Sequence, residues 1–403
     1  MNHFVFVVCG DKEHTDKLNF SLKFLRHFSK ADILVVTDTT RNENKIEHDR
    51  IIDIKTPEKF THHQASIFLK TGLIKYLPDM HEDKFCYLDS DVVAVSSMVD
   101  EVFYFDPSPV LFARDHCPFN EFSPHAMNCG CLSQYKIIKA GFNNAMKAYF
   151  GDYEPGTTES IKNLNQLNSI FNKYKKQPVK HVLKILRYLL MRYLSPTKKV
   201  RLEEFTFHKH NKCWYNKAGK MISFDYRYHR TKLLNQQGIY YKNKNWYNLN
   251  DQNITPRKPE CLHLQEYIAA NYNINIHEKW NHWNGGVFLF DRHAKSFLNY
   301  WQKISIEEFQ NKNTLTRDQF TLAISAWKFG LQNLKTLPVK FNFITEYANP
   351  DIRWSPAAGY TDDGFKTTFH PAFLHIYHHW GDTDWSIWQS VMKTGKENGI
   401  IAN

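Results

Sequence analysis

The sequence predicts an α/β fold, in which a mainly parallel, Rossmann-like sheet is flanked by helices and interrupted by a large, mainly helical or irregular insertion. Three observations support this prediction. Short apolar runs alternate with helical patterns in the first third of the chain, and the same alternation resumes in the last third. The middle is instead rich in Asn, Lys and Tyr and only weakly periodic. Alternation of strands and helices at this spacing is typical of βαβ units and a parallel sheet.

The first third of the chain contains four short apolar runs, each typical of a buried parallel strand. The strands are expected at residues 4–8, 33–36, 51–54 and 85–88. Apolar residues at helical spacing predict helices between these strands, at residues 18–28 and 66–77, the second ending before Pro78. In the last third, strands are expected at 286–290 and 373–377, and helices at 294–304 and 318–329.

The middle region is interpreted as an insertion or acceptor lobe, residues 120–280, between two halves of one core, residues 1–119 and 281–403. Its clearest element is a helix at 179–194, with an apolar stripe beside lysines and arginines. The stripe is interpreted first as a core or homo-oligomer contact. The alternative is docking to an anionic membrane surface, as basic amphipathic helices do.

The overall charge is positive, with 52 Lys and Arg against 41 Asp and Glu among 403 residues. A basic surface favours nucleotide diphosphates, nucleic acid or anionic lipid. Known nucleic-acid-binding motifs are absent from the sequence, so nucleic acid is not an expected partner. The apolar run near residue 4 is too short for a signal sequence, so none is expected, and no apolar stretch of the given sequence is long enough to span a membrane. The expected location is the cytoplasm, with peripheral contact at the inner face of the membrane as an alternative.

The seven cysteines include no Cys-x-x-Cys pair, so a structural zinc site is not expected. Cys129 and Cys131 form a Cys-x-Cys pair. They are interpreted first as ordinary buried thiols, because free cysteine usually behaves as a small hydrophobic residue, and a redox or metal site is the weaker alternative.

The strongest local signal is Asp89-Ser90-Asp91, which interrupts an otherwise apolar segment. In an extended chain the carboxylates of Asp89 and Asp91 lie on the same side. Two close carboxylates beside a buried strand repel each other unless a cation lies between them. Hard oxygen ligands suit Mg²⁺ or Mn²⁺, which also bind phosphate oxygens. The pair is therefore a candidate metal site at the end of a strand, where ligands of open α/β sheets bind.

The segment from Tyr87 to Val93 resembles the Asp-x-Asp strand end of glycosyltransferases with the GT-A fold, and most closely family 8, the group of glycogenin and lipopolysaccharide galactosyltransferases. Two further segments resemble this family in the same order: Trp283-Asn-Gly-Gly-Val-Phe-Leu-Phe290 and Arg317-Asp-Gln-Phe320. A third is Leu374-His-Ile-Tyr-His-His-Trp-Gly381. The resemblance covers residues 1–116 and 281–390. It implies a hexosyltransferase that uses a nucleotide-sugar donor, with UDP favoured.

The resemblance also implies roles for individual residues. Asp89 and Asp91 would bind Mn²⁺ or Mg²⁺, and Asp318, Asn284 and Gln319 would face the donor sugar. Asn128 is a second candidate for the asparagine, but the spacing to the Asp-Gln pair favours Asn284. The remaining donor contacts would come from a larger group of residues: Val8, Cys9, Gly10, Asp38, Lys70, Ser90 and Gly381.

His375 and His378 compete for the third metal position. His378 has the family's three-residue distance to Gly381, whereas His375 lies inside the apolar run, where a strand end could direct it at the cation. The family's Lys-Pro-Trp after the final glycine is replaced here by Asp382-Thr-Asp-Trp385. A diphosphate-binding lysine is therefore missing at this position.

The expected reaction is transfer of the sugar to a glycan, a lipid-linked or a protein acceptor, with the metal neutralising charge on the leaving diphosphate. The resemblance implies retention of configuration. The main alternative is a nucleotidyltransferase that makes a nucleotide sugar. Such an enzyme needs a Gly-rich basic loop after its first strand, and the segment from Cys9 to His14 has one glycine. A basic nucleic-acid-binding protein is a weaker alternative.

Overall fold

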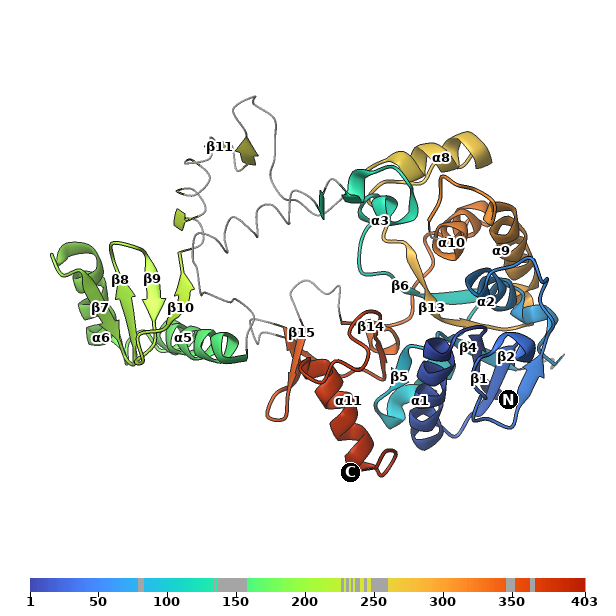
Figure 1. Cartoon of the computed structure of the whole chain (residues 1–403), viewed down its shortest axis with the longest axis horizontal. Coiled ribbons are helices and arrows are strands. Elements are labelled where there is room, and N and C mark those ends of the chain that lie inside the picture. The colour runs from blue at the N-terminus through green and yellow to red at the C-terminus, as the bar shows by residue number, and fades with distance from the viewer. Residues whose placement is uncertain are drawn as a thin grey trace. The chain divides into compact units, whose positions relative to one another are not determined.

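A computed structural model describes residues 1–78, 83–133, 135–136, 158–225, 228–229, 232, 235, 240–242, 245–247, 260–315, 317–345, 352–362 and 367–402. It confirms the predicted α/β fold with a mainly parallel sheet (Figure 1). The chain forms two compact units. The core unit comprises Met1–Cys131 and Pro259–Asn403, and the inserted unit comprises Leu132–Lys258.

The core unit is built on a six-stranded sheet with the order β3-β2-β1-β4-β13-β6. Its strands are β1 (Asn2–Val8), β2 (Asp32–Thr37), β3 (Ile51–Asp53), β4 (Lys84–Leu88), β6 (Val110–Arg114) and β13 (Trp283–Phe290). The first four strands along the chain are parallel, and β13 is antiparallel to both β4 and β6. The late strand β13 therefore lies inside the sheet, beside the strand that ends at the acid pair.

Helices cover both faces of this sheet, because β1 is apolar on both of its sides. Phe4, Phe6 and Val8 belong to one buried cluster, whereas Val5 and Val7 belong to another. Helices α1 and α11 contribute to the first cluster, and α2, α9 and α10 to the second. These helices are α1 (Lys12–Phe28), α2 (His62–Thr71), α9 (Lys295–Glu308), α10 (Arg317–Lys328) and α11 (Ser386–Glu397).

Two helices begin earlier than their apolar periodicity predicts, because polar residues cap their N-termini. The side chain of Asp11 accepts a hydrogen bond from the backbone of His14, so α1 already begins at Lys12. Thr61 and Gln64 form a capping box at the start of α2. The helix expected up to residue 77 ends at Thr71, and a 3₁₀ turn, Leu73–Lys75, follows it.

A small second sheet, β14-β18-β5, connects the C-terminal segment to the acid pair. Its strands are β5 (Val92–Ala94), β14 (Phe343–Ile344) and β18 (Phe373–His375). The antiparallel register of β5 and β18 sets His375 opposite Val92. His375 thereby lies next to Asp91 in space. A further antiparallel sheet near α11 comprises β15 (Ile352–Ser355), β16 (Gly359–Asp362) and β17 (Thr368–Phe369).

Two helices that overlap or fall within the range 120–280 pack within the core unit. They are α3 (Phe119–Ala126) and α8 (His263–Tyr272). Phe119 and Phe122 of α3 share a buried cluster with Leu264 and Ile268 of α8 and with Phe320 of α10. This packing explains why the core unit extends to Cys131 and resumes at Pro259.

The inserted unit contains a four-stranded antiparallel sheet in the order β10-β9-β8-β7, with helices beside it (Figure 1). Its described elements are α5 (Thr158–Lys176), α6 (Val182–Leu189), a π-helical turn (Leu190–Leu194), β7 (Lys199–Leu202), β8 (Phe205–His208), β9 (Cys213–Tyr215), β10 (Met221–Phe224), β11 (Tyr240–Lys242) and β12 (Asn245–Tyr247). Phe205, Phe207 and Trp214 of the sheet pack with Leu167 and Tyr188 of the helices.

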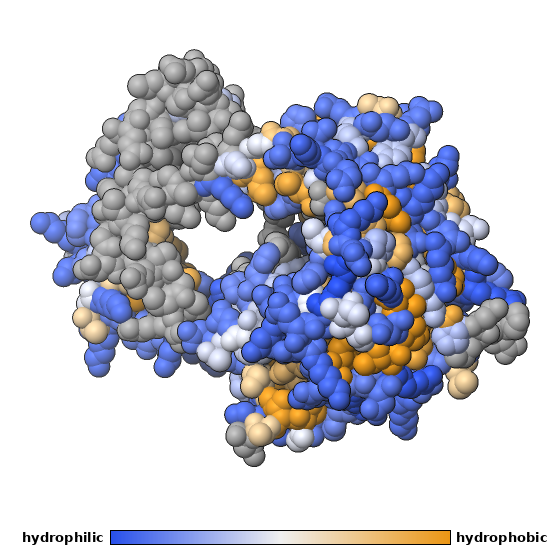
Figure 2. Space-filling model, turned by 45° about the vertical axis from the view of Figure 1, so that its right-hand side comes forward, coloured by the Kyte–Doolittle hydropathy of each residue, from blue (hydrophilic) through white to orange (hydrophobic). Residues whose placement is uncertain are grey.

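The apolar stripe predicted at 179–194 is largely exposed in the inserted unit. Val179 is 87% exposed, Leu183 is 78% exposed and Leu194 is 77% exposed, whereas Tyr188 packs inward. By contrast, the face drawn in Figure 2 is mostly hydrophilic, with hydrophobic residues in separate patches. No helix in the described part of the chain is long and apolar enough to cross a membrane.

Candidate functional site

The acid pair lies at the crossing from the large sheet to the small one. Asp89 follows β4, and its backbone N–H donates to the carbonyl of Gly286 on β13 at 2.8 Å. Asp91 precedes β5, and its carbonyl accepts from the backbone N–H of Ile376 at 3.1 Å. Two backbone hydrogen bonds to distant segments therefore fix the turn that presents both carboxylates.

Asp89, Asp91 and His375 form a group of side chains that could hold a metal ion. One ligand atom from each lies within 4.8 Å of the other two. Nε2 of His375 is 3.3 Å from Oδ1 of Asp91. Adjacent ligands of an octahedral Mn²⁺ or Mg²⁺ ion are separated by about 3 Å, given metal–ligand distances of about 2.1 Å. Two carboxylates and one imidazole thus match the charge, the ligand type and the spacing that such an ion requires.

The orientation of the His375 ring is set by a chain of amides. Nδ2 of Asn342 donates a hydrogen bond to Oδ1 of Asn284 at 3.0 Å. This bond orients the Asn342 amide so that Oδ1 of Asn342 lies 2.8 Å from Nδ1 of His375. Nδ1 therefore carries the proton that it donates to Asn342. Nε2 is buried without a hydrogen-bond partner and faces the carboxylates. This arrangement is typical of a metal-binding histidine, whose second ring nitrogen is held by a hydrogen bond.

Gly286 provides the space in which this group assembles. A Cβ atom at this position would lie 2.3 Å from Cε1 of His375 and 2.9 Å from Oδ2 of Asp89. A side chain here would therefore displace the imidazole or the carboxylate. The second glycine of the Asn-Gly-Gly motif is required by close approach rather than by a positive φ.

Lys70 on α2 links the acid pair to α10. Its Nζ lies 3.2 Å from Oδ1 of Asp89 and 3.2 Å from Oδ2 of Asp318. Burial lowers the pKa of Lys70, but the two carboxylates raise it by more, so the ammonium stays charged. Burial raises the pKa of Asp318, but the charge and hydrogen bond of Lys70 lower it by more. The pKa of Asp318 therefore lies below its usual value, and the carboxylate stays ionised.

Carboxylates outnumber the positive charges that contact them directly in this group. Three carboxylates, those of Asp89, Asp91 and Asp318, lie here, and the ammonium of Lys70 contacts two of them. Burial lowers the pKa of His375, and the carboxylates of Asp91 and Asp89 raise it by more. A divalent cation between the two aspartates would compensate this excess negative charge.

Two cavities meet at Lys70, Asp89 and Asp318. One has a volume of about 360 Å³ and extends past the end of β1, and the other, of about 340 Å³, extends toward α3. The first is lined by residues that include Val8, Cys9, His62, His63, Ser90 and Asp91. The second is lined by residues that include Asp115, Phe122, His125, Asn284, Gln319 and Tyr377. Each cavity is large enough for one part of an extended ligand.

A polar network forms the floor of the second cavity. Asn284 donates to Oδ2 of Asp115 at 3.0 Å and to the hydroxyl oxygen of Tyr377 at 2.9 Å. Gln319 also donates to Oδ2 of Asp115, at 2.9 Å. Burial raises the pKa of Asp115, but His282, His116 and these donors lower it well below the usual range. Asp115 therefore stays ionised and holds both amides in place.

Asp115 and Asn342 are site residues that the sequence patterns did not predict. Asp115 directly follows the apolar run of β6, so its place after a strand was a signal that could have found it. Asn342 follows a short 3₁₀ turn in the segment Phe341-Asn-Phe343, and nothing in its local pattern indicates that it orients both His375 and Asn284.

The other predicted donor contacts are placed as follows. Val8, Cys9 and Ser90 line the 360 Å³ cavity, and Gly10 has φ +129 beside the ring of His62. Asp38 is buried, and its oxygens accept hydrogen bonds from Thr40 and Thr56. Burial opposes ionisation of Asp38, but these hydrogen bonds lower its pKa to about 2.

Three further residues of the C-terminal and middle segments lie outside the metal group. His378 and Gly381 are exposed, and neither lines the two cavities. Asn128, the second candidate for the sugar-facing asparagine, is also exposed, and its backbone donates to the carbonyl of Asn313. The structure therefore brings Asn284 and His375 to the acid pair, rather than Asn128 and His378.

No protein-family model matches the chain, and no curated protein sequence is significantly similar to it. Among solved structures, the galactosyltransferase LgtC in complex with donor and acceptor sugar analogues is 12% identical, with a TM-score of 0.39, over 99% of this chain and 100% of that one. The bifunctional glycosyltransferase WbbM is 9% identical, with a TM-score of 0.39, over 97% of this chain and 49% of that one. Mouse xyloside xylosyltransferase 1 is 9% identical, with a TM-score of 0.36, over 93% of this chain and 98% of that one. These similarities are low and do not by themselves identify the function of this chain.

Proposed function

We propose that this protein is a metal-dependent glycosyltransferase that moves a sugar from a nucleotide diphosphate, expected to be UDP, to a glycan, lipid-linked or protein acceptor. The observation that supports it most is the group of Asp89, Asp91 and His375 at the junction of two cavities. A diphosphate ligand binds at such a metal, with the nucleotide on one side and the sugar on the other.

The two cavities differ in the groups that they offer. The 360 Å³ cavity lies at the carboxyl ends of β1 and β4, where nucleotides bind in open α/β sheets. The 340 Å³ cavity offers carboxylate, amide and phenol groups, which suit the hydroxyls of a sugar. The proposal therefore assigns the nucleotide to the first cavity and the donor sugar to the second.

The proposal assigns a separate role in binding the metal, the diphosphate or the sugar to each group of site residues. Asp89, Asp91 and His375 would hold Mn²⁺ or Mg²⁺, which stabilises the charge that develops on the diphosphate. Lys70 would add a second positive charge beside the same phosphates and at the same time fix Asp318 toward the sugar. Asn284 and Gln319, held by Asp115, would orient the sugar. Retention of configuration remains an expectation from the family resemblance.

The loop after β1 disfavours the nucleotidyltransferase alternative. Only Cys9, Gly10 and Asp11 separate β1 from α1, and Asp11 caps the helix. A Gly-rich loop that wraps around a nucleoside triphosphate needs several successive backbone N–H groups directed at the phosphates. A three-residue connection with one glycine does not provide them.

The first test is the metal dependence of nucleotide binding. UDP is expected to bind the full chain at least about ten-fold more tightly with Mn²⁺ than with EDTA, because the ion bridges the carboxylates and the diphosphate. Isothermal titration calorimetry measures both affinities, and GDP serves as the comparison nucleotide. The Asp91→Asn variant should show the weak affinity under both conditions. Equal UDP affinity with Mn²⁺ and with EDTA would refute the metal site.

The inserted unit supports a role in acceptor choice or location. Its exposed apolar stripe, which includes Val179, Leu183 and Leu194, adjoins the exposed cations Lys180 and Arg187. An apolar face bordered by cations is complementary to an anionic lipid surface. The proposal therefore includes peripheral binding to an anionic membrane, where a lipid-linked acceptor would be found.

Membrane binding by the inserted unit can be tested by reversing the charge of two cations beside the apolar stripe. The double variant Lys180→Glu/Arg187→Glu should bind anionic liposomes at least about 30-fold more weakly, since each cation near such a surface contributes about 1 kcal/mol. Lys184 is left intact because it pairs with Glu203 at 2.9 Å. Cosedimentation with vesicles of phosphatidylcholine and phosphatidylserine measures the binding.

The control for this experiment is Lys217→Glu/Lys220→Glu, which makes the same change in net charge at exposed positions in the turn between β9 and β10. It should bind like the wild type. Donor hydrolysis should persist in both variants. If the first variant binds anionic vesicles as well as its control does, the stripe is a packing surface instead.

A further inference from the structure

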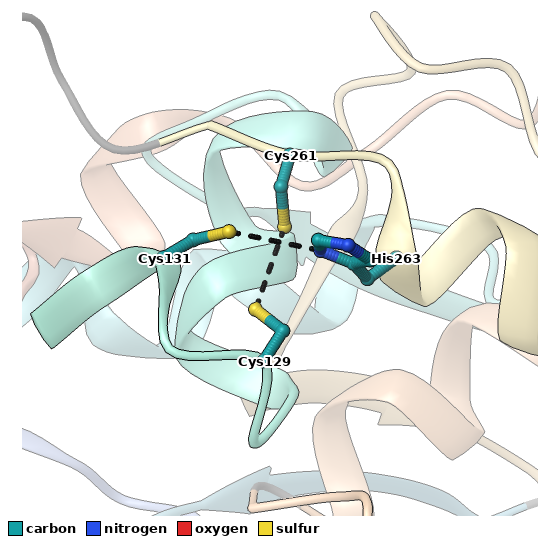
Figure 3. A group of neighbouring side chains, drawn as sticks. All are labelled: Cys129, Cys131, Cys261 and His263. Carbon is teal, nitrogen blue, oxygen red and sulfur yellow. Dashed lines mark hydrogen bonds between the residues drawn. The ribbon is translucent and has the colours of Figure 1, made fainter. Parts of the chain in front are cut away.

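A second group of potential metal ligands lies away from the site described above. It consists of Cys129, Cys131, Cys261 and His263 (Figure 3). One ligand atom from each residue lies within 4.8 Å of the other three. Sγ of Cys129 is 3.9 Å from Sγ of Cys261, and Sγ of Cys131 is 3.7 Å from Nδ1 of His263. The four side chains point toward a common centre (Figure 3).

These distances match a tetrahedral zinc site. Zinc binds thiolate sulfur at about 2.3 Å and imidazole nitrogen at about 2.0–2.1 Å. Two ligands at tetrahedral angles are then separated by about 3.5–3.8 Å. Three sulfurs and one imidazole nitrogen form a common closed ligand set for structural zinc. The group is more than a thiol pair, because a disulfide would use two of the sulfurs and leave the third sulfur and the imidazole without a role.

The backbone around each ligand pair directs the side chains of that pair toward the same point. Gly130, between the first two cysteines, has φ +79, which a side chain would strain, and this turn lets both neighbouring thiols face the same point. The backbone N–H of Asn128 donates to Asn313, and that of Cys261 donates to Asn120. Both ligand segments are thereby anchored to the core unit.

A serine provides outer support for one of the sulfurs. Oγ of Ser123 on α3 lies 3.0 Å from Sγ of Cys261 and accepts a hydrogen bond from the backbone N–H of Leu264 at 3.0 Å. If Cys261 is a thiolate, it can only accept, so the hydroxyl of Ser123 would donate to its sulfur. A hydroxyl donor at this distance stabilises a thiolate and orients it, as outer partners do in zinc sites.

We propose that Cys129, Cys131, Cys261 and His263 bind one Zn²⁺ ion that fastens together the two points at which the chain leaves and re-enters the core unit. The inserted segment departs after Cys131 and returns before Cys261. On binding, the three thiols lose their protons to solvent and the neutral imidazole coordinates through Nδ1. The site would close a loop of about 130 residues at its base, and this inference is independent of the proposed transferase activity.

The site would also stabilise a wall of the 340 Å³ cavity. Cys261 and His263 lead into α8, which packs on α3. Phe122 and His125 of α3 line that cavity. A zinc ion in this position would therefore help to hold α3 against α8 at this wall of the cavity.

The experiment uses the full chain, purified under reducing conditions and reconstituted with Zn²⁺ or Co²⁺. We expect one equivalent of zinc per chain by mass spectrometry of the metal. We also expect Co²⁺ to produce the thiolate-to-cobalt charge-transfer band of a tetrahedral sulfur site. This band distinguishes the proposed cysteine site from the proposed site at the acid pair, because Asp89, Asp91 and His375 contain no sulfur.

Variants test which residues bind the metal. Cys131→Ser/Cys261→Ser should lose the charge-transfer band and one equivalent of zinc. Cys213→Ser, at a buried thiol of the inserted unit, should retain both. His263→Cys should keep one equivalent and intensify the band, which tests the site even if the double variant does not fold.

Three outcomes would overturn the proposal. The first is a fully reduced wild-type chain that gives no charge-transfer band with Co²⁺. The second is a band that survives unchanged in Cys131→Ser/Cys261→Ser. The third is a band in His263→Cys that is identical to that of the wild type, since a fourth sulfur must alter it.

Discussion

Replacement of Asp91 by asparagine is expected to lower sugar transfer by about three orders of magnitude while the protein stays folded. The amide offers one weaker oxygen and no charge to the ion. Loss of about 4 kcal/mol of charge stabilisation at the leaving diphosphate corresponds to about a thousand-fold in rate. Nucleotide-sugar hydrolysis at limiting Mn²⁺ measures the effect without knowledge of the acceptor.

Asp384→Asn is the matched control, because it removes one exposed carboxylate from the C-terminal segment outside the metal group. Its activity should equal that of the wild type. Circular dichroism should show the same fold for both variants. The assignment of Asp91 fails if hydrolysis by Asp91→Asn at limiting metal stays within a few-fold of the control.

The strands of the core and the acid pair could be predicted from local pattern alone. Residues 4–8 and 85–88 are uninterrupted apolar runs, and a run buried on both faces has few alternatives to a central strand. Asp89 and Asp91 stand out against such flanks because charge at the end of a buried strand needs a partner. These predictions depend on neighbours in sequence, which one chain displays directly.

The sequence reduced the candidates for the third metal ligand to two histidines, but it could not select between them. The choice between His375 and His378 depends on the register of β18 against β5, which no local pattern specifies. Asn342 orients His375 across 33 residues of chain, and Asp115 holds Asn284 across 169. Such contacts between distant residues leave no local trace in a single sequence.

The boundaries between the core unit and the inserted unit were also only partly predictable from the sequence. Composition changes near residue 120, yet α3 and α8 belong to the packing of the core unit. The two helices are short, eight and ten residues, so their periodicity gives a weak signal. Cys129 and Cys131 were expected to be buried thiols, but both are half-buried and lie beside Cys261 and His263. The spacing Cys-x-Cys differs from Cys-x-x-Cys, and about 130 residues separate the two pairs, so local pattern does not indicate that the four residues meet.

The second large effect is a higher Mn²⁺ requirement, which is expected when His375 is replaced but not when His378 is replaced. His375→Ala should raise the Mn²⁺ concentration needed for half-maximal activity by about 100-fold or more, since even the outer partners of metal ligands contribute about 10–100-fold. Nε2 of His375 faces Asp91 at 3.3 Å, and its ring is held by Asn342. His378→Ala removes an exposed ring outside the metal group and should leave the Mn²⁺ requirement within about two-fold.

The two variants are compared by titration of donor hydrolysis with Mn²⁺, and thermal unfolding separates loss of a ligand from loss of packing. His375 is buried, so its alanine variant should also unfold at a lower temperature, whereas His378→Ala should not. His375→Gln, which refills much of the volume, should recover stability more than metal affinity. If His378→Ala shifts the Mn²⁺ requirement and His375→Ala does not, the third ligand is His378, and the register of β18 does not set the metal site.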